Sequence, residues 1–248
     1  MHSGDTKMTE RQSALFVGAG PGLGAALVQR FAAAGMNITA TARSAGKAAA
    51  VAEAASAVSD SGSEIVGLQA DATNEAEIND LFATHTARWG APGLVIYNAG
   101  AFMKASIVGA TADDFRRCWE ANCFGGFIVA KAAAERMVEH GQGTILFSGA
   151  TASKRGGAQF FNLAVGKAGL LALAQSMARE LGPQGIHVAH VVIDGQIMSE
   201  RYAHLADERP PEGLLDPAAI AETYWQLHCQ PRSAWTLETE LRPWVEKF

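Results

Sequence analysis

The chain has few cysteines and a small net charge, and each of these features excludes certain classes of protein. It has three cysteines in 248 residues, an odd number without paired metal-ligand spacing, which indicates reduced thiols in a cytoplasmic protein. The formal net charge is −5 and no long basic run occurs, so a nucleic-acid partner is not expected. None of the seven histidines forms a His-x-x-x-His pair, which argues against a metal site.

Long apolar runs are missing as well. Stretches such as residues 169–174 are far too short to span a membrane, so we expect no membrane partner. The first twelve residues are polar and contain no apolar core of a signal peptide. We therefore expect residues 1–12 to be a disordered leader and residues 13–248 to form the folded part.

What the chain does have is a regular alternation of strand-like and helix-like segments. With 48% hydrophobic residues in 248, it can bury the core of one generous α/β domain. Nearly continuous apolar strands between helices predict a parallel sheet that is covered on both faces. The predicted strands are 14–18, 37–42, 64–70, 94–97, 144–147 and 187–193, and the predicted helices are 22–34, 46–59, 74–89, 111–139 and 159–181. This pattern indicates a single-domain, Rossmann-like, doubly wound three-layer αβα fold, in which ligands bind at the carboxyl ends of the strands.

The pattern changes after Gly195. Residues 198–217 are polar and irregular, and they follow a strand's carboxyl end, so they form either a substrate-covering lid or an ordinary surface loop. Asp216 and Pro217 look like the N-cap and first residue of a helix that runs to about residue 230. Residues 235–237 could add a final short strand.

The most informative segment is the glycine-rich run that starts at Gly18. It reads Gly-Ala-Gly-Pro-Gly-Leu-Gly, follows the first predicted strand and opens the first predicted helix. Glycines allow the backbone to approach a pyrophosphate, and a helix N-terminus presents free N–H groups and partial positive charge to it. This placement between strand and helix predicts a dinucleotide site.

Several further segments, in the same order and at similar spacing, make residues 12–200 resemble the short-chain dehydrogenase/reductase family. Gly18, Gly22 and Gly24 are similar to the Gly-x-x-x-Gly-x-Gly turn of that family, and Asn98-Ala99-Gly100 to its Asn-Ala-Gly run. The resemblance implies an adenine contact at Asp71, a proton-relay asparagine at Asn122, an active-site lysine at Lys167 and a nicotinamide contact at Ile197. The cofactor-binding residues that we expect are Gly18, Gly20, Gly22, Leu23, Gly24, Arg43, Asp71, Ala72, Asn98, Ala99, Gly100, Lys167, Gly195 and Ile197. Asp71 could instead cap the helix that begins near Asn74.

The second predicted strand indicates the form of the cofactor. It ends without the acidic residue that would bind the ribose 2′-hydroxyl of NAD, and Arg43 follows at once, with Lys47 one helical turn later. A guanidinium can hold a 2′-phosphate through two hydrogen bonds, which favours NADP(H) over NAD(H). Arg43 could alternatively be a solvated residue at a helix start.

The resemblance breaks where proton chemistry is expected. The family has a tyrosine four residues before the lysine, on the same helical face, and this chain has Leu163 there. Where the family has a serine that hydrogen-bonds the substrate oxygen, this chain has Ala150. Loss of a positioned general acid costs about two to four orders of magnitude in rate. Ordinary carbonyl reduction through a phenol is therefore not expected.

Other groups could supply the proton. Ser148 ends the fifth predicted strand, and we take it as a candidate catalytic residue with Lys167 and Asn122. Asp194 stands where the family has proline and either acts as an acid or caps the turn that follows. Tyr202 and His204 could fold over the nicotinamide from the 198–217 segment.

Three functions remain open at this stage. The first is an NADP(H)-dependent oxidoreductase acting on a small or medium apolar carbonyl, alcohol or activated alkene. The second is a catalytically silent NADP(H) sensor, which Leu163 and Ala150 favour. The third is an oligomerisation scaffold, since family members pair through helices that match 111–139 and 159–181, so we expect a homodimer or homotetramer.

Overall fold

The computed structural model describes residues 12–59 and 62–246. The predicted leader, residues 1–12, lies outside the described residues except for Gln12, whose carbonyl accepts a hydrogen bond from the backbone of Asn37. Among the described residues, no helix has the length and apolar character needed to cross a membrane.

Seven parallel strands form one sheet in the order β3-β2-β1-β4-β5-β6-β7. Their bounds are β1 Ser13–Val17, β2 Asn37–Ala42, β3 Ile65–Gln69, β4 Leu94–Tyr97, β5 Gly143–Ser148, β6 Ile186–Ile193 and β7 Glu238–Leu241. β1 lies between β2 and β4, so the strand order reverses there. In open sheets of this kind, ligands bind beyond the carboxyl ends of the strands at such a switch point.

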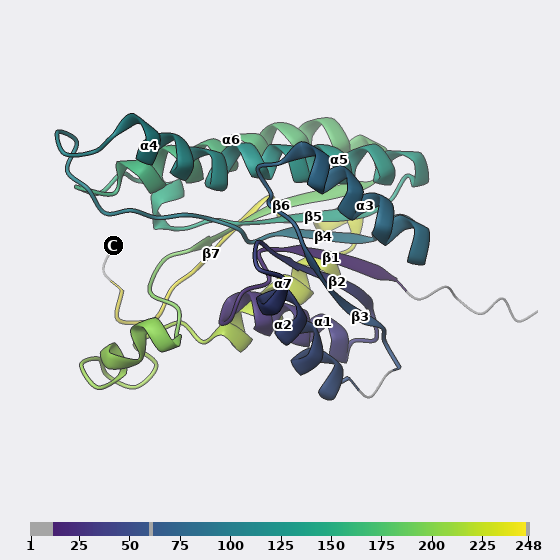
Figure 1. Ribbon diagram of the computed structural model, residues 1–248, viewed down its shortest axis with the longest axis horizontal. Helices are drawn as coiled ribbons and strands as arrows, with labels where there is room; N and C mark the ends of the chain where they lie inside the picture. The colour runs from purple at the N-terminus through teal and green to yellow at the C-terminus, as the bar shows by residue number, and fades with distance from the viewer. Residues whose placement is uncertain (1–11, 60–61, 247–248) are drawn as a thin grey trace, which may run out of the picture.

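Helices cover both faces of this sheet (Figure 1). On one face lie α1 Leu23–Ala33, α2 Ala45–Ala57 and α7 Pro217–His228, and on the other lie α3 Glu75–Trp89, α4 Ala112–Trp119, α5 Gly125–His140 and α6 Phe161–Leu181. Each face has its own apolar cluster, one around Phe31 and Tyr224, the other around Phe82 and Leu170. Burial of the strands from both sides explains their continuous apolar runs, and the predicted Rossmann-like fold is confirmed.

The helical segment predicted over 111–139 is confirmed, with one feature that the sequence did not indicate. A π-helical turn, Glu120–Phe124, interrupts the α-helical hydrogen bonding and separates α4 from α5. Within this turn, the carbonyl of Ala121 accepts a hydrogen bond from the buried Tyr97 hydroxyl at 2.7 Å. Such single π-turns are common at functional sites, and this one contains Asn122.

The final strand is also displaced from its predicted position. Residues 235–237 were expected to form it, but β7 begins at Glu238. Trp235 stacks on the His187 ring at 5.0 Å instead, and the backbone of Thr236 donates to the side chain of Gln230. β7 is a polar edge strand with only one neighbour, so it lacks the apolar run by which a buried strand is recognised.

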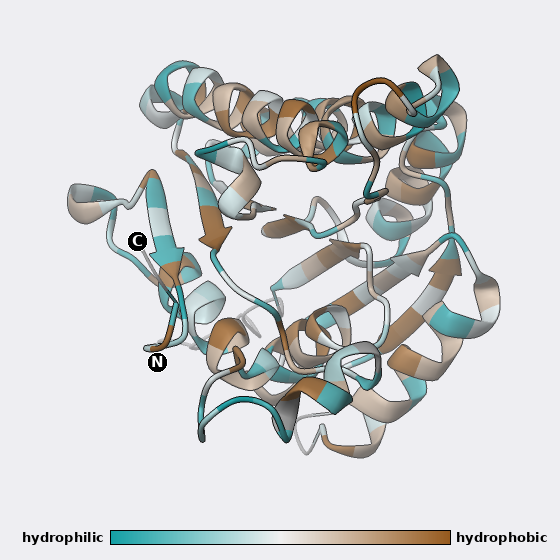
Figure 2. Cartoon of the chain, turned by 90° about the vertical axis from the view of Figure 1, so that its left-hand side faces the viewer, coloured by the Kyte–Doolittle hydropathy of each residue, from teal (hydrophilic) through white to brown (hydrophobic). Residues whose placement is uncertain are grey.

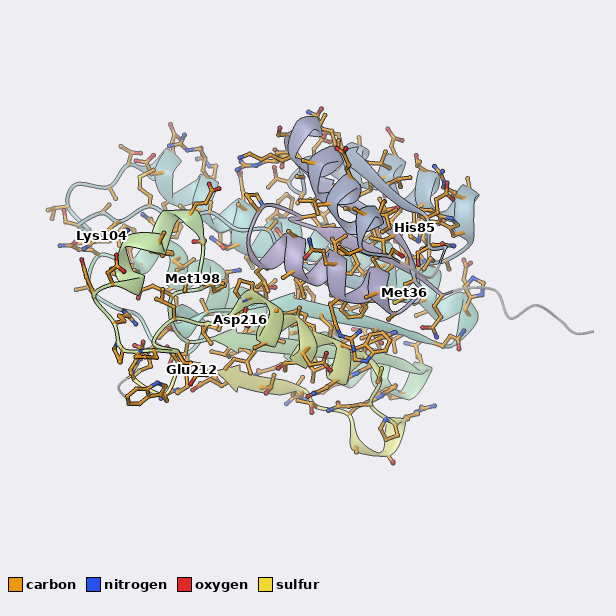
Figure 3. The ribbon with its side chains drawn as sticks, turned by 90° about the horizontal axis from the view of Figure 1, so that it is seen from below. Met36, His85, Lys104, Met198, Glu212 and Asp216 are labelled. Atoms are coloured by element: carbon orange, nitrogen blue, oxygen red, sulfur yellow. The ribbon has the colours of Figure 1, made fainter. Side chains whose placement is uncertain are left out.

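A buried histidine links the starts of two strands to α3. The two ring nitrogens of His85 (labelled in Figure 3) lie 2.9 Å from Thr39 Oγ1 and 3.0 Å from Ser13 Oγ. Burial lowers the pKa of this imidazole from 6.5 to about 4. The folded protein therefore holds His85 neutral at pH values where the unfolded chain protonates it.

This difference makes stability depend on pH. The stabilising effect of neutral His85 is complete above pH 6.5 and is lost as the pH falls toward 4, because only the unfolded state gains the proton. When the pH is lowered from 7 to 5, protonation of His85 in the unfolded chain should reduce the free energy of unfolding by about 2 kcal/mol. In guanidinium unfolding at the two pH values, His85→Gln should show a pH dependence weaker by that amount, and the exposed control His140→Gln should match the wild type. An unchanged dependence in His85→Gln would contradict the assignment.

Candidate functional site

Two adjoining clefts lie at the edge of the sheet where the strands end, the edge that faces the viewer in Figure 2. The larger has a volume of about 880 Å³ and is lined by the ends of β1, β2, β3 and β4 and by α4. The smaller, of about 390 Å³, is lined by the glycine-rich loop, the ends of β5 and β6, and α6. Between them they are bordered by every predicted cofactor-binding residue, Gly18, Gly20, Gly22, Leu23, Gly24, Arg43, Asp71, Ala72, Asn98, Ala99, Gly100, Lys167, Gly195 and Ile197.

Two glycines of the glycine-rich loop, Gly18 and Gly24, are packed too closely to carry a side chain. Gly18 has φ +95°, and a Cβ there would lie 2.4 Å from the backbone nitrogen of Ala99. A Cβ on Gly24 would lie 2.6 Å from the carbonyl oxygen of Gly18. α1 begins directly after Gly22 with no side-chain cap on its first turn, so its N-terminus is suited to an anion. This cradle fits the pyrophosphate of a dinucleotide.

The larger cleft continues from the loop to charged side chains. Arg43 and Lys47 are exposed at its border, directly after β2 and in the first turns of α2. The carboxylate of Asp71 accepts hydrogen bonds from the backbone and the hydroxyl of Thr73, at 2.9 and 2.8 Å. Asn98 donates to the carbonyl of Gly18 at 3.0 Å and so fastens the loop after β4 to the loop after β1.

The alternative role of Asp71 as a helix cap is wrong. Asn74 caps α3, because its side-chain oxygen accepts from the backbone N–H groups of Ala76 and Glu77. The Asp71 carboxylate is held two residues earlier, in its own turn with Thr73.

Lys167 and Asn122 meet beside Gly100. The Lys167 side chain is buried, Nζ donates to the carbonyl of Ser148 at 2.7 Å, and burial lowers the pKa of the amine to about 8. Asn122 is fully buried and donates through Nδ2 to the carbonyls of Ala101 and Cys118, while its Oδ1 has no partner among the described residues. A Cβ on Gly100 would lie 2.8 Å from Asn122 Oδ1 and 3.6 Å from Lys167 Nζ. An unpaired acceptor and an amine therefore border the same small space.

Ser148 contributes its carbonyl to this space, and its hydroxyl is used elsewhere. Ser148 Oγ lies 2.7 Å from the hydroxyl of Tyr224, which belongs to α7 on the opposite face of the sheet from α6. Both groups are buried, and burial raises the pKa of the Tyr224 phenol. This geometry disfavours the expected role of Ser148 as a catalytic proton donor.

Asp194 is ion-paired. Its carboxylate accepts from Arg242 at 2.6 Å and from the hydroxyl of Thr151, and only 4% of its side chain is exposed. The contacts support the structural alternative, in which Asp194 fixes the turn after β6.

Two apolar residues that the sequence singled out, Leu163 and Ala150, belong to elements around the smaller cleft. Leu163 lies one helical turn before Lys167 on α6, and Ala150 borders the smaller cleft next to Gly149. Across that cleft, Tyr202 approaches from the 3-10 helix Glu200–Ala206, within the predicted lid segment, whereas His204 is exposed to solvent. The two ends of the 198–217 segment are held together, because the backbone N–H of Met198 donates a hydrogen bond to the carbonyl of Leu215.

Sequence reasoning missed the segment after Gly100. Ala101, Phe102 and Met103 line the larger cleft, together with residues of α4 such as Cys118. The segment forms neither helix nor strand, so no periodicity marks it. The described residues also include no cluster of three or more histidine, cysteine or acidic side chains that could hold a metal ion.

Comparison with known proteins agrees with this architecture. A family model described as short chain dehydrogenase matches residues 12–206. The crystal structure of a short-chain dehydrogenase from Rhodopseudomonas palustris is 40% identical, with a TM-score of 0.80, and the match covers 94% of this chain and 100% of that one.

Two more distant matches extend the comparison. A 3-oxoacyl-[acyl-carrier-protein] reductase of Mycobacterium tuberculosis is 29% identical over 204 residues, or 82% of this chain and 76% of the relative. A metagenomic short-chain oxidoreductase, solved in complex with NADP, is 22% identical with a TM-score of 0.81 and covers 95% of this chain and 98% of its own. At that identity the likeness to the metagenomic protein shows the fold alone.

Proposed function

The chain belongs to the short-chain dehydrogenase family, and from this premise we propose that it is an NADP(H)-dependent oxidoreductase with an atypical proton donor. Its substrate would be a small or medium apolar carbonyl, alcohol or activated alkene. When bound, the nicotinamide supplies or accepts the hydride, and the residues of this chain position the reactants and move the proton. Leu163 and Ala150 make it a divergent member in which the usual phenol and serine hydroxyl are replaced by apolar groups.

The phosphorylated form of the cofactor is supported by the end of β2. Arg43 and Lys47 present two cations at the border of the larger cleft, and the Arg43 guanidinium can bind a 2′-phosphate through two hydrogen bonds.

The observation that carries the proposal is the space shared by Lys167 Nζ and the unpaired Asn122 Oδ1. In our proposal these two groups hold a water next to the substrate oxygen. In carbonyl reduction the hydride goes to carbon, the C–O π pair moves to oxygen, and oxygen takes a proton from this water. The Lys167 ammonium then returns a proton to the water. A lysine whose pKa is about 8 is suited to this exchange near neutral pH.

The other candidates for the proton are engaged in contacts of their own. The Ser148 hydroxyl pairs with Tyr224, and Asp194 is ion-paired with Arg242. Leucine has no proton to give. An activated alkene relaxes the requirement further, because hydride addition gives an enolate that Lys167 can stabilise, and the final proton can reach carbon from solvent.

The test is NADPH consumption, followed at 340 nm, by purified protein with a panel of aliphatic and aromatic aldehydes, ketones and enones. We expect slow but selective turnover by the wild type. Leu163→Tyr combined with Ala150→Ser should lower the rate with the best substrate at least about tenfold if the apolar residues suit the water-based route.

The alternative is a silent NADP(H) sensor, and the absence of protic groups at Leu163 and Ala150 is the observation that favours it. NADPH binding without turnover of any panel member by the wild type, together with activity that appears only in the double variant, would replace the oxidoreductase proposal by the sensor.

A further inference from the structure

The segment 101–105 runs from the cofactor cleft to the outer end of the molecule without regular secondary structure. Figure 3 shows its Lys104 at the same end as Met198 of the 198–217 segment, and at the opposite end from Met36 and His85. The exposure of the segment alternates, since residues 101, 103 and 105 are half-buried while Phe102 and Lys104 are exposed. Because this segment does not pair with a strand, other hydrogen bonds must hold its backbone in the conformation that gives this alternating exposure.

Two buried asparagine amides provide that support. Asn122 Nδ2 donates to the carbonyl of Ala101 at 2.6 Å, and Asn162 Nδ2 donates to the carbonyl of Met103 at 3.2 Å. The next alternate residue, Ala105, donates its backbone N–H to the carbonyl of Gln159 at 3.2 Å. The segment is thus held at every second residue, and the anchors come from the π-helical turn and from α6 and its approach.

Asn162 stands out among these anchors. Its side chain is fully buried at the start of α6, and Oδ1 has no partner among the described residues. A buried amide costs free energy unless its hydrogen bonds repay the lost hydration, and the one bond that it makes here goes to the segment. A leucine would fill the same volume without that cost, so packing alone does not account for an amide.

The segment in turn places an aromatic ring. Phe102 stacks on Phe160 with ring centroids 5.0 Å apart and planes 15° apart. The two rings come from different parts of the chain, Phe102 from the anchored segment and Phe160 from the residue before α6. They remain 38% and 37% exposed, so the pair presents a flat apolar surface within one helical turn of Leu163. Aromatic rings bind other flat rings by offset or edge contacts more strongly than they bind saturated groups of equal size.

We propose that Asn162 is a positioning residue that holds the 101–105 segment so that Phe102 and Phe160 form a specificity wall for the flat, conjugated part of a substrate. The inference rests on the proposed function, because it assumes that substrate enters beside Leu163. It adds a substrate class: aryl or otherwise conjugated carbonyl compounds, in preference to saturated compounds of the same size.

Equilibrium binding tests the wall without requiring turnover. The probes are 2-acetylnaphthalene and its saturated analogue 2-acetyldecalin, titrated by calorimetry into NADP⁺-saturated protein. The wild type should prefer the flat probe, and Phe102→Leu should weaken binding of that probe about tenfold while changing binding of the saturated one less than about threefold. The control Phe115→Leu, which removes the separate stack of Phe115 on Phe161, should leave both affinities unchanged.

The role of Asn162 is tested by the same titration and by hydrogen exchange. Asn162→Leu should reproduce the loss seen in Phe102→Leu, and Asn162→Gln, which keeps an amide donor, should recover most of it. In Asn162→Leu, amides 101–106 should exchange faster, whereas those of β5 should not change. Far-ultraviolet circular dichroism should match that of the wild type in every variant, which excludes a general loss of folding.

The outcomes separate the two proposals. Failure of every carbonyl to be reduced would overturn the oxidoreductase function but leave the probe preference intact. A wild type that binds neither probe or prefers the saturated one rejects the wall. Unchanged exchange of the segment in Asn162→Leu, or equal loss of both probes, rejects the positioning role.

Discussion

Replacing Gly18 by alanine should abolish measurable NADPH binding, a loss of at least about 100-fold in affinity. The new Cβ would lie 2.4 Å from the backbone nitrogen of Ala99 and 2.6 Å from the backbone carbon of Asn98, and the residue would have to keep φ +95°. Backbone atoms cannot swing aside as a side chain can. The loop must therefore move, and the hydrogen bond from Asn98 to the Gly18 carbonyl is lost with it.

Calorimetric titration with NADPH, and with NADH for comparison, measures this effect. Gly182→Ala is the matched control, because a Cβ there meets nothing within 4 Å and the residue lies at the far end of α6. Far-ultraviolet circular dichroism should show that the Gly18→Ala protein keeps its helices. Wild-type affinity in a folded Gly18→Ala protein would mean that the glycine-rich loop does not form the cofactor cradle.

Replacing Lys167 by methionine should lower the turnover number for the best carbonyl substrate at least about 100-fold. Methionine keeps most of the buried stem but removes the amine that donates to the Ser148 carbonyl and faces Asn122 Oδ1. In the wild type, reduction consumes a proton, so its rate should be highest below the lysine pKa of about 8 and should fall as the pH rises through that value. Alcohol oxidation should show the opposite trend.

Initial rates between pH 6 and pH 10 measure both effects. Lys167→Arg keeps the positive charge over this range, so any activity that it retains should lose the decline near pH 8. Lys131→Met, which removes an exposed ion pair with Glu135 on α5, serves as the control and should behave like the wild type. If Lys167→Met turned over normally, the proton would have to come from elsewhere, and Tyr202 at the smaller cleft would be the next residue to test.

Much of the cofactor cleft could be read from the sequence because its signals are local. Gly18 and Gly24 stand at a strand-to-helix turn, and Asn98 follows an apolar run, so neighbouring residues were enough to place them at the carboxyl edge. The π-helical turn at Glu120–Phe124 left no such mark, because its backbone serves a distant partner, the hydroxyl of Tyr97. The final strand was misplaced by a few residues for a related reason, since an edge strand does not need the apolar residues that identify a buried one.

The side-chain contacts around Lys167 were harder to predict from the sequence, as Ser148, Asp194 and Asn162 show. The position of Ser148 at a strand end was foreseen, but its hydroxyl could have faced either side, and Tyr224, 76 residues away, decided that it faces α7. The sequence around Asp194 is compatible with an acid or with a structural anchor, and the ion pair with Arg242 favours the anchor. Nothing near Asn162 in the chain indicates that its amide reaches Met103, 59 residues away.

By itself, the sequence determined the layered fold and the tight glycine turn after β1, since solvent exclusion from both faces of a parallel sheet and close backbone approach each restrict the residues allowed at a given place. Only the tertiary structure decided which polar groups remain available for chemistry. Each hydroxyl, carboxylate or amide can bond to whatever approaches it, and that choice depends on segments far away in the chain, which local composition and periodicity do not encode.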